Sequence, residues 1–433
     1  MSTTSPDTLT FRDGATGASR PAWRELELRF EVITPVFGGG VYIDPASAHV
    51  KEIDRRTPVR FSEIRQQLRF WWRACHVHRH QSLSEMRERE MLIFGSTKRR
   101  GAMTGAVVRQ PTSCEDFEIF ESHQGAGGRF NPRAIRGYEA IAYGAFPLQH
   151  KAGMNSQTEN GVLHALSGTV VVKLRVHADD AMLQELRTAC SAWLHLGGIG
   201  GRTRRGFGAV SPTNPEEWSQ FRDDPSGAPR AEELQSVASL HGAARVTSTQ
   251  NWRTATEALS FGLRRLQTFR QGVEVARARG MNKPSFSWWP EPDELRRLFP
   301  AGDYPWELHP VGRFPRAQFG MPIIFDFRPL HHPPSVAKSE LTPSENTSRW
   351  PSPLILRPTY DPAVKGFVCI ALALDVARPN SAYITPRVPR IAGRSVAVSL
   401  TESDAASVVP LGKTGKARNP DVVLAFLDFF TNL

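Results

Sequence analysis

The chain has 433 residues, and its 54 lysines and arginines against 43 acidic residues give a formal net charge of +11 at pH 7. This length exceeds what one hydrophobic core of ordinary size supports, so we expect two or three domains. Most of the cations are arginine, whose planar fork of donors suits phosphates and the stacking of bases. The composition therefore favours a polyanionic partner.

Cysteine usage and hydropathy exclude several classes of protein. The four cysteines, Cys75, Cys114, Cys190 and Cys369, lie far apart and form no C-x-x-C pair, which argues against a zinc ribbon and a disulfide framework. The N-terminal residues are polar, and no apolar run approaches the roughly 18 residues that a membrane span needs. We expect a soluble cytoplasmic protein with no metal and no other cofactor.

The N-terminal region predicts a disordered leader followed by a strand. Residues 1–20 are polar and form the leader, whereas residues 25–34 (ELELRFEVIT) alternate between apolar and charged side chains. Strict alternation is typical of a half-buried β-strand. The predicted strand ends at Pro35 and leads into a glycine turn made of Gly38, Gly39 and Gly40.

The next segment predicts an amphipathic helix that starts at an N-cap, Ser62. Its core-facing arc comprises Ile64, Leu68, Trp71, Trp72 and Cys75, and an arginine stripe beside that arc comprises Arg65, Arg69 and Arg73. One interpretation makes the tryptophans core and the arginines a solvated or salt-bridged face. The other gives the stripe an anionic ligand, because only Glu63 is acidic between positions 61 and 84.

The rest of the first half completes a β-α-β-β-α-β order. We expect a short helix over residues 85–94, a basic turn (GSTKRRG), and an insertion over residues 110–168 that contains a strand at residues 138–146. A strand at 169–176, a helix at 179–196 and a strand at 207–210 follow. This order is the split β-α-β arrangement of ferredoxin-like and RNA-recognition domains, so residues 21–212 are predicted to form an N-terminal ferredoxin-like domain.

A glycine-rich loop (GGIGGRTRRGFG, residues 197–208) separates that helix from that strand. Its glycines, Gly197, Gly198, Gly200, Gly201, Gly206 and Gly208, permit close approach of another backbone or a phosphate. A dinucleotide-binding fingerprint requires strand, loop and then helix, so the loop does not fit that motif. Arg202, Arg204 and Arg205 repel one another unless an anion or nearby acidic residues neutralise their charges, so we expect an anionic ligand there.

The second half predicts a linker and a second domain. Residues 213–250 are expected to form the linker, with one or two helical turns, and residues 251–433 a C-terminal ferredoxin-like domain. Its expected elements are a basic helix at 252–279, strands at 322–327, 354–357 and 367–375, a mobile loop at 331–348, and a terminal helix in DVVLAFLDFFTNL. The expected fold class is α+β, with two tandem ferredoxin-like (RRM-like) domains and insertions.

Several motifs, in order, resemble the repeat-associated mysterious protein (RAMP) superfamily of CRISPR systems. They are ITPVFGGG, RFSEIRQQLRFWWRA, REREMLIFGST and GGIGGRTRRGFG, followed by FPRAQFGMPIIF and SPLILRP in the second half. Within the superfamily the chain is most similar to the two-domain subunit that caps one end of the type III-B (Cmr) effector complex. The resemblance implies contacts to guide and target RNA at the 3′ end of the guide, and neighbours among the other Cmr subunits rather than a homo-oligomer or a membrane.

Residues and resemblance together predict an RNA-binding surface on which the arginine stripe and the glycine-rich loop converge around the glycine turn. Its members are Gly38, Gly39, Gly40, Arg60, Arg65, Arg69, Trp72, Arg73, Gly198, Gly200, Gly201, Arg202, Arg204 and Arg205. The alternative is a RAMP-type endoribonuclease, in which Asp44 or Asp54 would be the catalytic carboxylate. The residues His76, His78 and His80 cannot share one face of a helix, so a metal site or paired acid-base use is not expected there.

Overall fold

The computed structural model describes residues 23–38, 54–124, 130–149, 161–218, 230–271, 287–304, 307–327, 334–388, 390–408 and 419–431. The predicted leader, residues 1–20, lies outside these ranges. No helix within them is long and apolar enough to cross a membrane. The four cysteines, Cys75, Cys114, Cys190 and Cys369, are free thiols in this structure.

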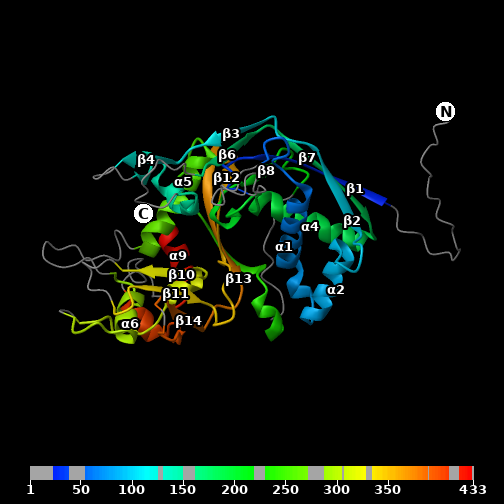
Figure 1. The fold of residues 1–433 in the computed structure, drawn as a ribbon. Helices are drawn as coiled ribbons and strands as arrows, with labels where there is room; N and C mark the ends of the chain where they lie inside the picture. The colour runs from blue at the N-terminus through cyan, green and yellow to red at the C-terminus, as the bar shows by residue number, and fades with distance from the viewer. Residues whose placement is uncertain are drawn as a thin grey trace, which may run out of the picture.

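The N-terminal unit is a four-stranded antiparallel sheet covered by helices. The strands β1 (Trp23–Val32), β2 (Met103–Arg109), β7 (Val170–His177) and β8 (Val210–Pro212) lie in the order β2-β7-β1-β8. Helices α1 (Phe61–His76) and α4 (Asp180–Leu196) pack against each other, and α2 (Leu83–Phe94) lies beside α1 (Figure 1). This strand order is that of a split β-α-β unit, as the sequence pattern predicts.

Local sequence explains the main elements of this unit. Strand β1 buries Leu26, Leu28, Phe30 and Val32 on one face, which confirms the alternation seen in the sequence. Helix α4 begins after Asp179, whose carboxylate accepts a hydrogen bond from the Met182 backbone N–H at 2.8 Å. Helix α1 starts at Phe61 with Arg60 in the N-cap position, so the predicted cap at Ser62 is wrong.

The insertion between β2 and β7 forms two antiparallel strand pairs and a short helix. Strand β3 (Ser113–Phe117) pairs with β6 (Leu163–Ser167), and β4 (Phe120–Gln124) pairs with β5 (Phe130–Ala134). The strand predicted at residues 138–146 is instead helix α3 (Glu139–Gly144). The helix buries Ala140, Ile141 and Ala142 in contact with the second half of the chain, and tertiary packing decides its conformation there.

The second half contains a three-stranded antiparallel sheet in the order β12-β13-β9. Its strands are β9 (Ser239–Thr247), β12 (Leu354–Asp361) and β13 (Gly366–Asp375), and helices α5 (Ala255–Gln271) and α9 (Val422–Thr431) pack on it. Strand β9 corrects the predicted linker over residues 213–250, because it belongs to this sheet. The chain order β9-α5-β12-β13-α9 matches the first five elements of a ferredoxin-like unit, and a complete second ferredoxin-like domain stays a prediction.

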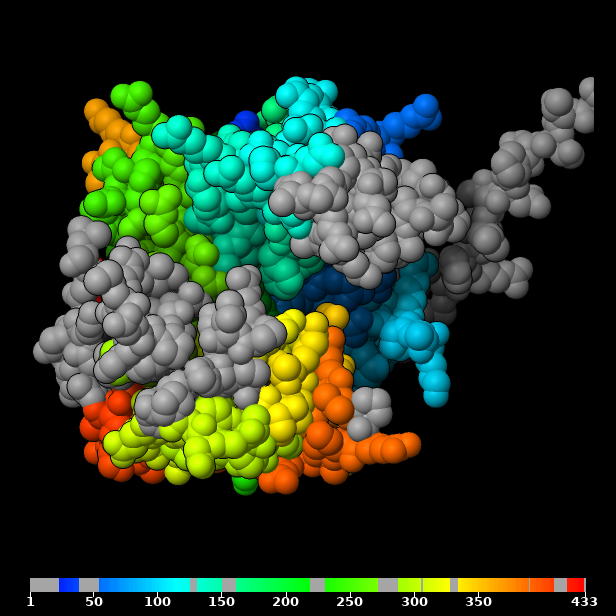
Figure 2. Space-filling view, turned by 60° about the vertical axis from the view of Figure 1, so that its left-hand side comes forward, coloured from blue at the N-terminus to red at the C-terminus, as the bar shows by residue number. Residues whose placement is uncertain are grey.

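A third sheet comes from two insertions into that second unit. Strands β10 (Ile323–Asp326), β11 (Lys338–Thr342), β14 (Ser381–Pro386) and β15 (Arg394–Ala397) lie in that order, near α6 (Glu291–Leu298). Strand β11 falls within residues 331–348, which the sequence predicts as a loop. Figure 2 shows yellow and orange residues of these insertions at the bottom of the molecule and cyan and teal residues of the first half at the top.

The two halves share hydrophobic core. The cluster around α1 and α4 includes Ile370 and Leu372 of β13, and the cluster around α5 and α9 includes Phe207 of the glycine-rich loop and Leu163 of β6. The glycine-rich loop and the start of α1 therefore lie where the two halves meet.

Candidate nucleic-acid interface

Helix α1 presents its arginine stripe beside a buried apolar face. Ile64, Leu68, Trp71 and Trp72 are at most 2% exposed. The sequence hypothesis included Trp72 among RNA contacts, and the structure corrects this. The ring of Trp72 lies in the core, where a base cannot stack on it, and its Nε1 donates to Glu185 Oε2 at 3.0 Å.

The stripe has an acidic partner that the local sequence does not reveal. Glu90 of α2, only 4% exposed, accepts hydrogen bonds from Arg69 Nε and from Arg73 Nη1, the latter at 2.8 Å. For Arg69 and Arg73, the premise that the stripe lacks a carboxylate partner is therefore wrong. One carboxylate shared by two guanidinium groups still leaves a net positive charge at this place.

The glycine-rich loop is shaped by close backbone contacts. A Cβ atom added to Gly208 (φ +59°) would lie 2.0 Å from the Ile199 carbonyl oxygen, and the Gly201 N–H donates to Phe37 O at 2.7 Å. The Gly200 N–H donates to a carboxylate oxygen of Glu63, and burial raises the pKa of that carboxyl. These glycines thus permit close packing between backbone segments of the same chain. An RNA contact by Gly198, Gly200 or Gly201 stays a prediction.

The three arginines of the loop point to different surroundings. Arg204 donates from Nη1 to the Ser352 carbonyl and lies over the Phe70 ring, 5.0 Å from its centroid. Arg202 donates to Gly144 O at 2.8 Å. They diverge instead of forming one patch.

Arg205 is the least compensated of the three. Its Nη1 is buried with no hydrogen-bond partner, and so is the Nε of Arg270 from α5. Burial, with a smaller contribution from the positive charge of Arg270, lowers the pKa of Arg205 to about 9. A buried guanidinium donor without a hydrogen-bond partner is costly, so an anion would stabilise this place.

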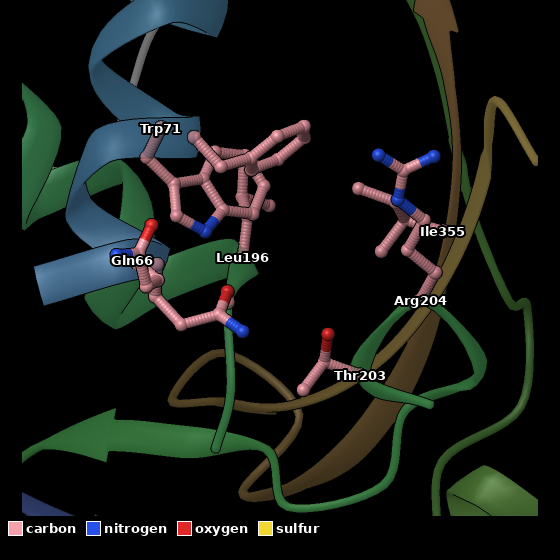
Figure 3. Close-up of a pocket in the computed structure, with 9 residues that line it drawn as sticks. Gln66, Trp71, Leu196, Thr203, Arg204 and Ile355 are labelled. Carbon is pink, nitrogen blue, oxygen red and sulfur yellow. The ribbon is translucent and has the colours of Figure 1, made fainter. Parts of the chain in front are cut away.

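Two hollows flank the Phe70–Arg204 contact, and together we call them the inter-half cleft. The first, of about 200 Å³, is lined by residues of α1, the end of α4, the loop and β12: Gln66, Gln67, Phe70, Trp71, Leu196, Gly197, Thr203, Arg204 and Ile355. Figure 3 shows Trp71 and Gln66 on the α1 side facing Thr203 and Arg204 on the loop side.

The second hollow of the cleft, of about 280 Å³, joins the stripe to the loop. It is lined by Phe70, Arg73, Arg204, Ser236, Val237, Ala238, Trp350, Pro351, Pro353 and Val376. Arg73 and Arg204 therefore line one hollow, whereas Arg65 lines a different one, and a surface shared by the two whole arginine groups stays a prediction. Neither hollow of the cleft has a carboxylate among its lining residues.

Other predicted site residues have structural or undescribed positions. Gly38 (φ +52°) ends the described part of the glycine turn, and Gly39 and Gly40 lie outside the described residues. The Arg60 carbonyl accepts hydrogen bonds from the first turn of α1, and an RNA contact by its side chain stays a prediction.

The alternative catalytic residues are engaged in structural contacts or lie outside the described ranges. Asp54 accepts from the backbone N–H of Arg56 at 2.9 Å and from the Thr57 hydroxyl, and the Thr57 bond is the largest cause of the lowered pKa of Asp54. Asp44 is not among the described residues.

Burial lowers the pKa of His76 to about 4, and its Nδ1 contacts the Trp72 carbonyl at 2.9 Å. Within the described part of the chain, no three His, Cys, Asp or Glu side chains are placed to hold a metal ion.

The sequence analysis missed Phe70, Trp350 and Arg357. Phe70 and Trp350 carry no local signal beyond an aromatic side chain, and the fold brings both to one hollow from positions far apart in the chain. Arg357 lies within the SPLILRP motif, and its guanidinium group donates to carbonyls at the end of α4.

Comparison with known proteins bears on the first half of the chain. Residues 29–211 match the model of the RAMP superfamily, from β1 through the glycine-rich loop. This match confirms the resemblance that the motifs indicate. No match was found among curated proteins.

Solved structures of Cmr proteins show distant similarity. Cmr1 from Pyrococcus furiosus, in its apo form, is 12% identical with a TM-score of 0.42, covering 85% of this chain and 91% of that chain. A chain of the type III-B Cmr-beta complex bound to cognate target RNA is 11% identical with a TM-score of 0.38, covering 80% of this chain and 94% of that one. Cmr6 from Pyrococcus furiosus is 10% identical with a TM-score of 0.24, covering 44% and 98%. With TM-scores below 0.5, these similarities do not establish a shared fold.

Proposed function

Since residues 29–211 match the RAMP superfamily, we propose that this chain is an RNA-binding structural subunit of a type III-B CRISPR (Cmr) ribonucleoprotein effector complex. In this role it caps the 3′ end of the guide RNA and helps to capture target RNA for antiviral defence. Its partners are the guide RNA, the target RNA and the other Cmr subunits.

The inter-half cleft is the observation that carries the RNA-binding part of the proposal. It presents two aromatic rings, Phe70 and Trp350, beside the guanidinium groups of Arg73 and Arg204. Unstacked bases of single-stranded RNA bind aromatic faces and arginine planes, while arginine also forms charge-assisted bonds to phosphate. A duplex offers no free base faces, so the cleft fits a single strand.

Arg205 and Arg270 add to this argument. Their buried donors without partners lie where the glycine-rich loop meets α5, and the neighbouring charges repel Arg205. A phosphate group near them would satisfy donors that no described side chain satisfies.

Binding of labelled single-stranded RNA, measured by fluorescence anisotropy, tests this function. Arg204→Ala removes one charge-assisted contact and should weaken affinity by about 1–3 kcal/mol, or roughly 5- to 150-fold. Phe70→Leu keeps apolar bulk but removes the ring face, and should weaken binding as well. Arg187→Ala is the matched control, because this arginine is exposed on α4 and lines neither hollow.

The thermal melting temperature of each variant must accompany the affinity. Arg204 contacts Ser352, so its loss lowers stability modestly, and binding is measured well below the melting transition. Folded Arg204→Ala protein with full RNA affinity would contradict the cleft assignment. Cleavage of the RNA, with or without magnesium, would instead support the endoribonuclease alternative.

The capping role needs a separate measurement. In a reconstituted complex, a photoreactive group at the 3′ end of the guide RNA should crosslink to this chain, and one at the 5′ end should not. Crosslinking from the 5′ end alone would refute the capping role and leave RNA binding intact.

A further inference from the structure

A separate basic hollow, outside the inter-half cleft, lies between α1 and the turn that joins α2 to β2. It has a volume of about 420 Å³ and is lined by Arg65, Ser96, Thr97, Lys98, Arg99, Arg100, Gly101, Met103 and Thr104. None of these residues lines the inter-half cleft, so the two places are distinct. Four of the nine are cations, three carry a hydroxyl, and none is acidic.

Among the residues that the structure describes, none forms an ion pair with the cations of this hollow. Lys98, Arg99 and Arg100 are exposed, and their side chains form no ion pair with any residue that the structure describes. Arg65 is held by a bond from Nη2 to the Phe94 carbonyl, while its Nε is buried and has no hydrogen-bond partner. A fixed arginine with a spare donor therefore stands beside three free charges.

The turn itself is held in one shape. The Ser96 hydroxyl accepts from the backbone N–H groups of Lys98 and Arg99 at 3.2 and 3.1 Å, and the Ser96 N–H donates to Arg99 O at 2.8 Å. A Cβ atom on Gly101 would lie 2.4 Å from the Gly95 nitrogen, so the two ends of the turn are in contact. Such a turn presents its cations without the entropic cost of ordering a mobile loop.

We propose that this hollow, the turn site, binds phosphate groups of a single RNA strand that also occupies the inter-half cleft. This inference rests on the proposed RNA binding and extends it toward the N-terminal end of α1. Arg65 and Arg73 are eight residues apart, which is about 12 Å along the helix axis, a span that a few nucleotides bridge. Arginine forks and hydroxyl groups match phosphate oxygens, and no carboxylate in the lining opposes them.

The test compares two triple variants of the full chain. Lys98→Ala/Arg99→Ala/Arg100→Ala removes the exposed cations of the turn, and Arg187→Ala/Arg253→Ala/Arg349→Ala removes the same charge at exposed positions away from it. RNA affinity is measured across a range of salt concentrations, because each neutralised phosphate contributes about −0.7 to the log–log slope for a single strand. Melting temperatures confirm that both variants are folded.

We expect the turn variant to bind RNA at least about tenfold more weakly at low salt, with a slope flatter by about 1 to 2, while the control keeps the wild-type slope. The turn variant should bind a trinucleotide in the cleft as the wild type does and lose affinity only for longer strands. An unchanged slope for long RNA, or equal flattening in the control, overturns the turn site. In that case a weakened Arg204→Ala would still support the cleft, so the two proposals fail separately.

Inorganic phosphate distinguishes an RNA strand from a free anion. Calorimetric titration should show no saturable phosphate binding at low salt in either variant or the wild type. Saturable binding that the turn variant loses while its RNA affinity stays normal would assign the site to a free anion and overturn the proposal. If the turn variant keeps its RNA affinity but is no longer captured by the other Cmr subunits, the turn contacts an acidic protein surface instead. That result also overturns the proposal.

Discussion

Arg357 of β12 joins the two halves of the molecule, and replacing it with leucine should destabilise the whole chain. Its side chain is 2% exposed. Its Nε donates to His195 O at 3.0 Å and its Nη2 to Leu194 O at 3.2 Å, and further bonds reach Gly197 O and Val210 O. These carbonyls include the end of α4, where helical carbonyls lack partners and the helix dipole favours a cation.

The magnitude follows from the bonds that are lost. A hydrogen bond to a charged group contributes about 1.5–3 kcal/mol, and a buried acceptor left without a partner costs about 1–3 kcal/mol. Four such bonds do not add fully, because leucine fills part of the space and the neighbouring carbonyls relax. We therefore expect a loss of about 3–5 kcal/mol, which is below the sum of the four charged hydrogen bonds.

Thermal unfolding followed by circular dichroism measures this loss. A change of 1 kcal/mol shifts the melting temperature by about 2–4 °C in domains of 150–250 residues, so Arg357→Leu should lower it by at least about 6 °C. Arg357→Lys keeps the charge but not the fork of donors, and should fall between wild type and Arg357→Leu. Arg349→Leu, at an exposed position in the same half, is the control. A melting temperature of Arg357→Leu within about 1 °C of the wild type would refute the structural role of this arginine.

Three further predictions concern the loop, the acid response and the charge. Gly208→Ala places a Cβ atom against Ile199 O, whereas Gly137 also has a positive φ but has open space around it. In thermal melting, Gly208→Ala should therefore destabilise the protein far more than Gly137→Ala, and equal losses would mean that φ strain alone matters. Burial lowers the pKa of His76 from the ordinary histidine value of 6.5 to about 4, so the unfolded chain binds more protons than the folded chain between these values. The free energy of unfolding should therefore fall by on the order of 2 kcal/mol as the pH drops from 7 to 5. His76→Phe should lose less over the same range, and an identical loss in both proteins would contradict this prediction. RNA affinity should fall linearly on a log–log salt plot, with a slope of about −0.7 per phosphate contact, and an affinity independent of salt would remove the electrostatic argument.

Sequence reasoning worked best where a short stretch determines its own conformation. The alternation in β1 and the apolar arc of α1 follow from the geometry of one strand and one helix, and both match the structure. The order of elements around them predicted the arrangement β2-β7-β1-β8, because chain connectivity allows few sheets of this kind.

The prediction failed where a segment depends on distant residues for its burial. Within residues 138–146, the segment Glu139–Gly144 forms α3 because its apolar side chains pack against α5, and β9 forms because it pairs with the edge of β13. Neither partner is visible from the local pattern, since β-strand preference reflects packing against neighbours more than the residues themselves.

For the candidate site, the sequence by itself determined the residue types: an arginine stripe, a glycine-rich loop with three arginines, and an excess of positive charge. Only the tertiary structure decided their partners. It buried Trp72, paired Arg69 and Arg73 with Glu90, and set Arg204 between Phe70 and a carbonyl 148 positions along the chain. The physical reason is that helix periodicity fixes which side chains share a face, while the charge and the exposure of that face depend on which distant segments pack against it.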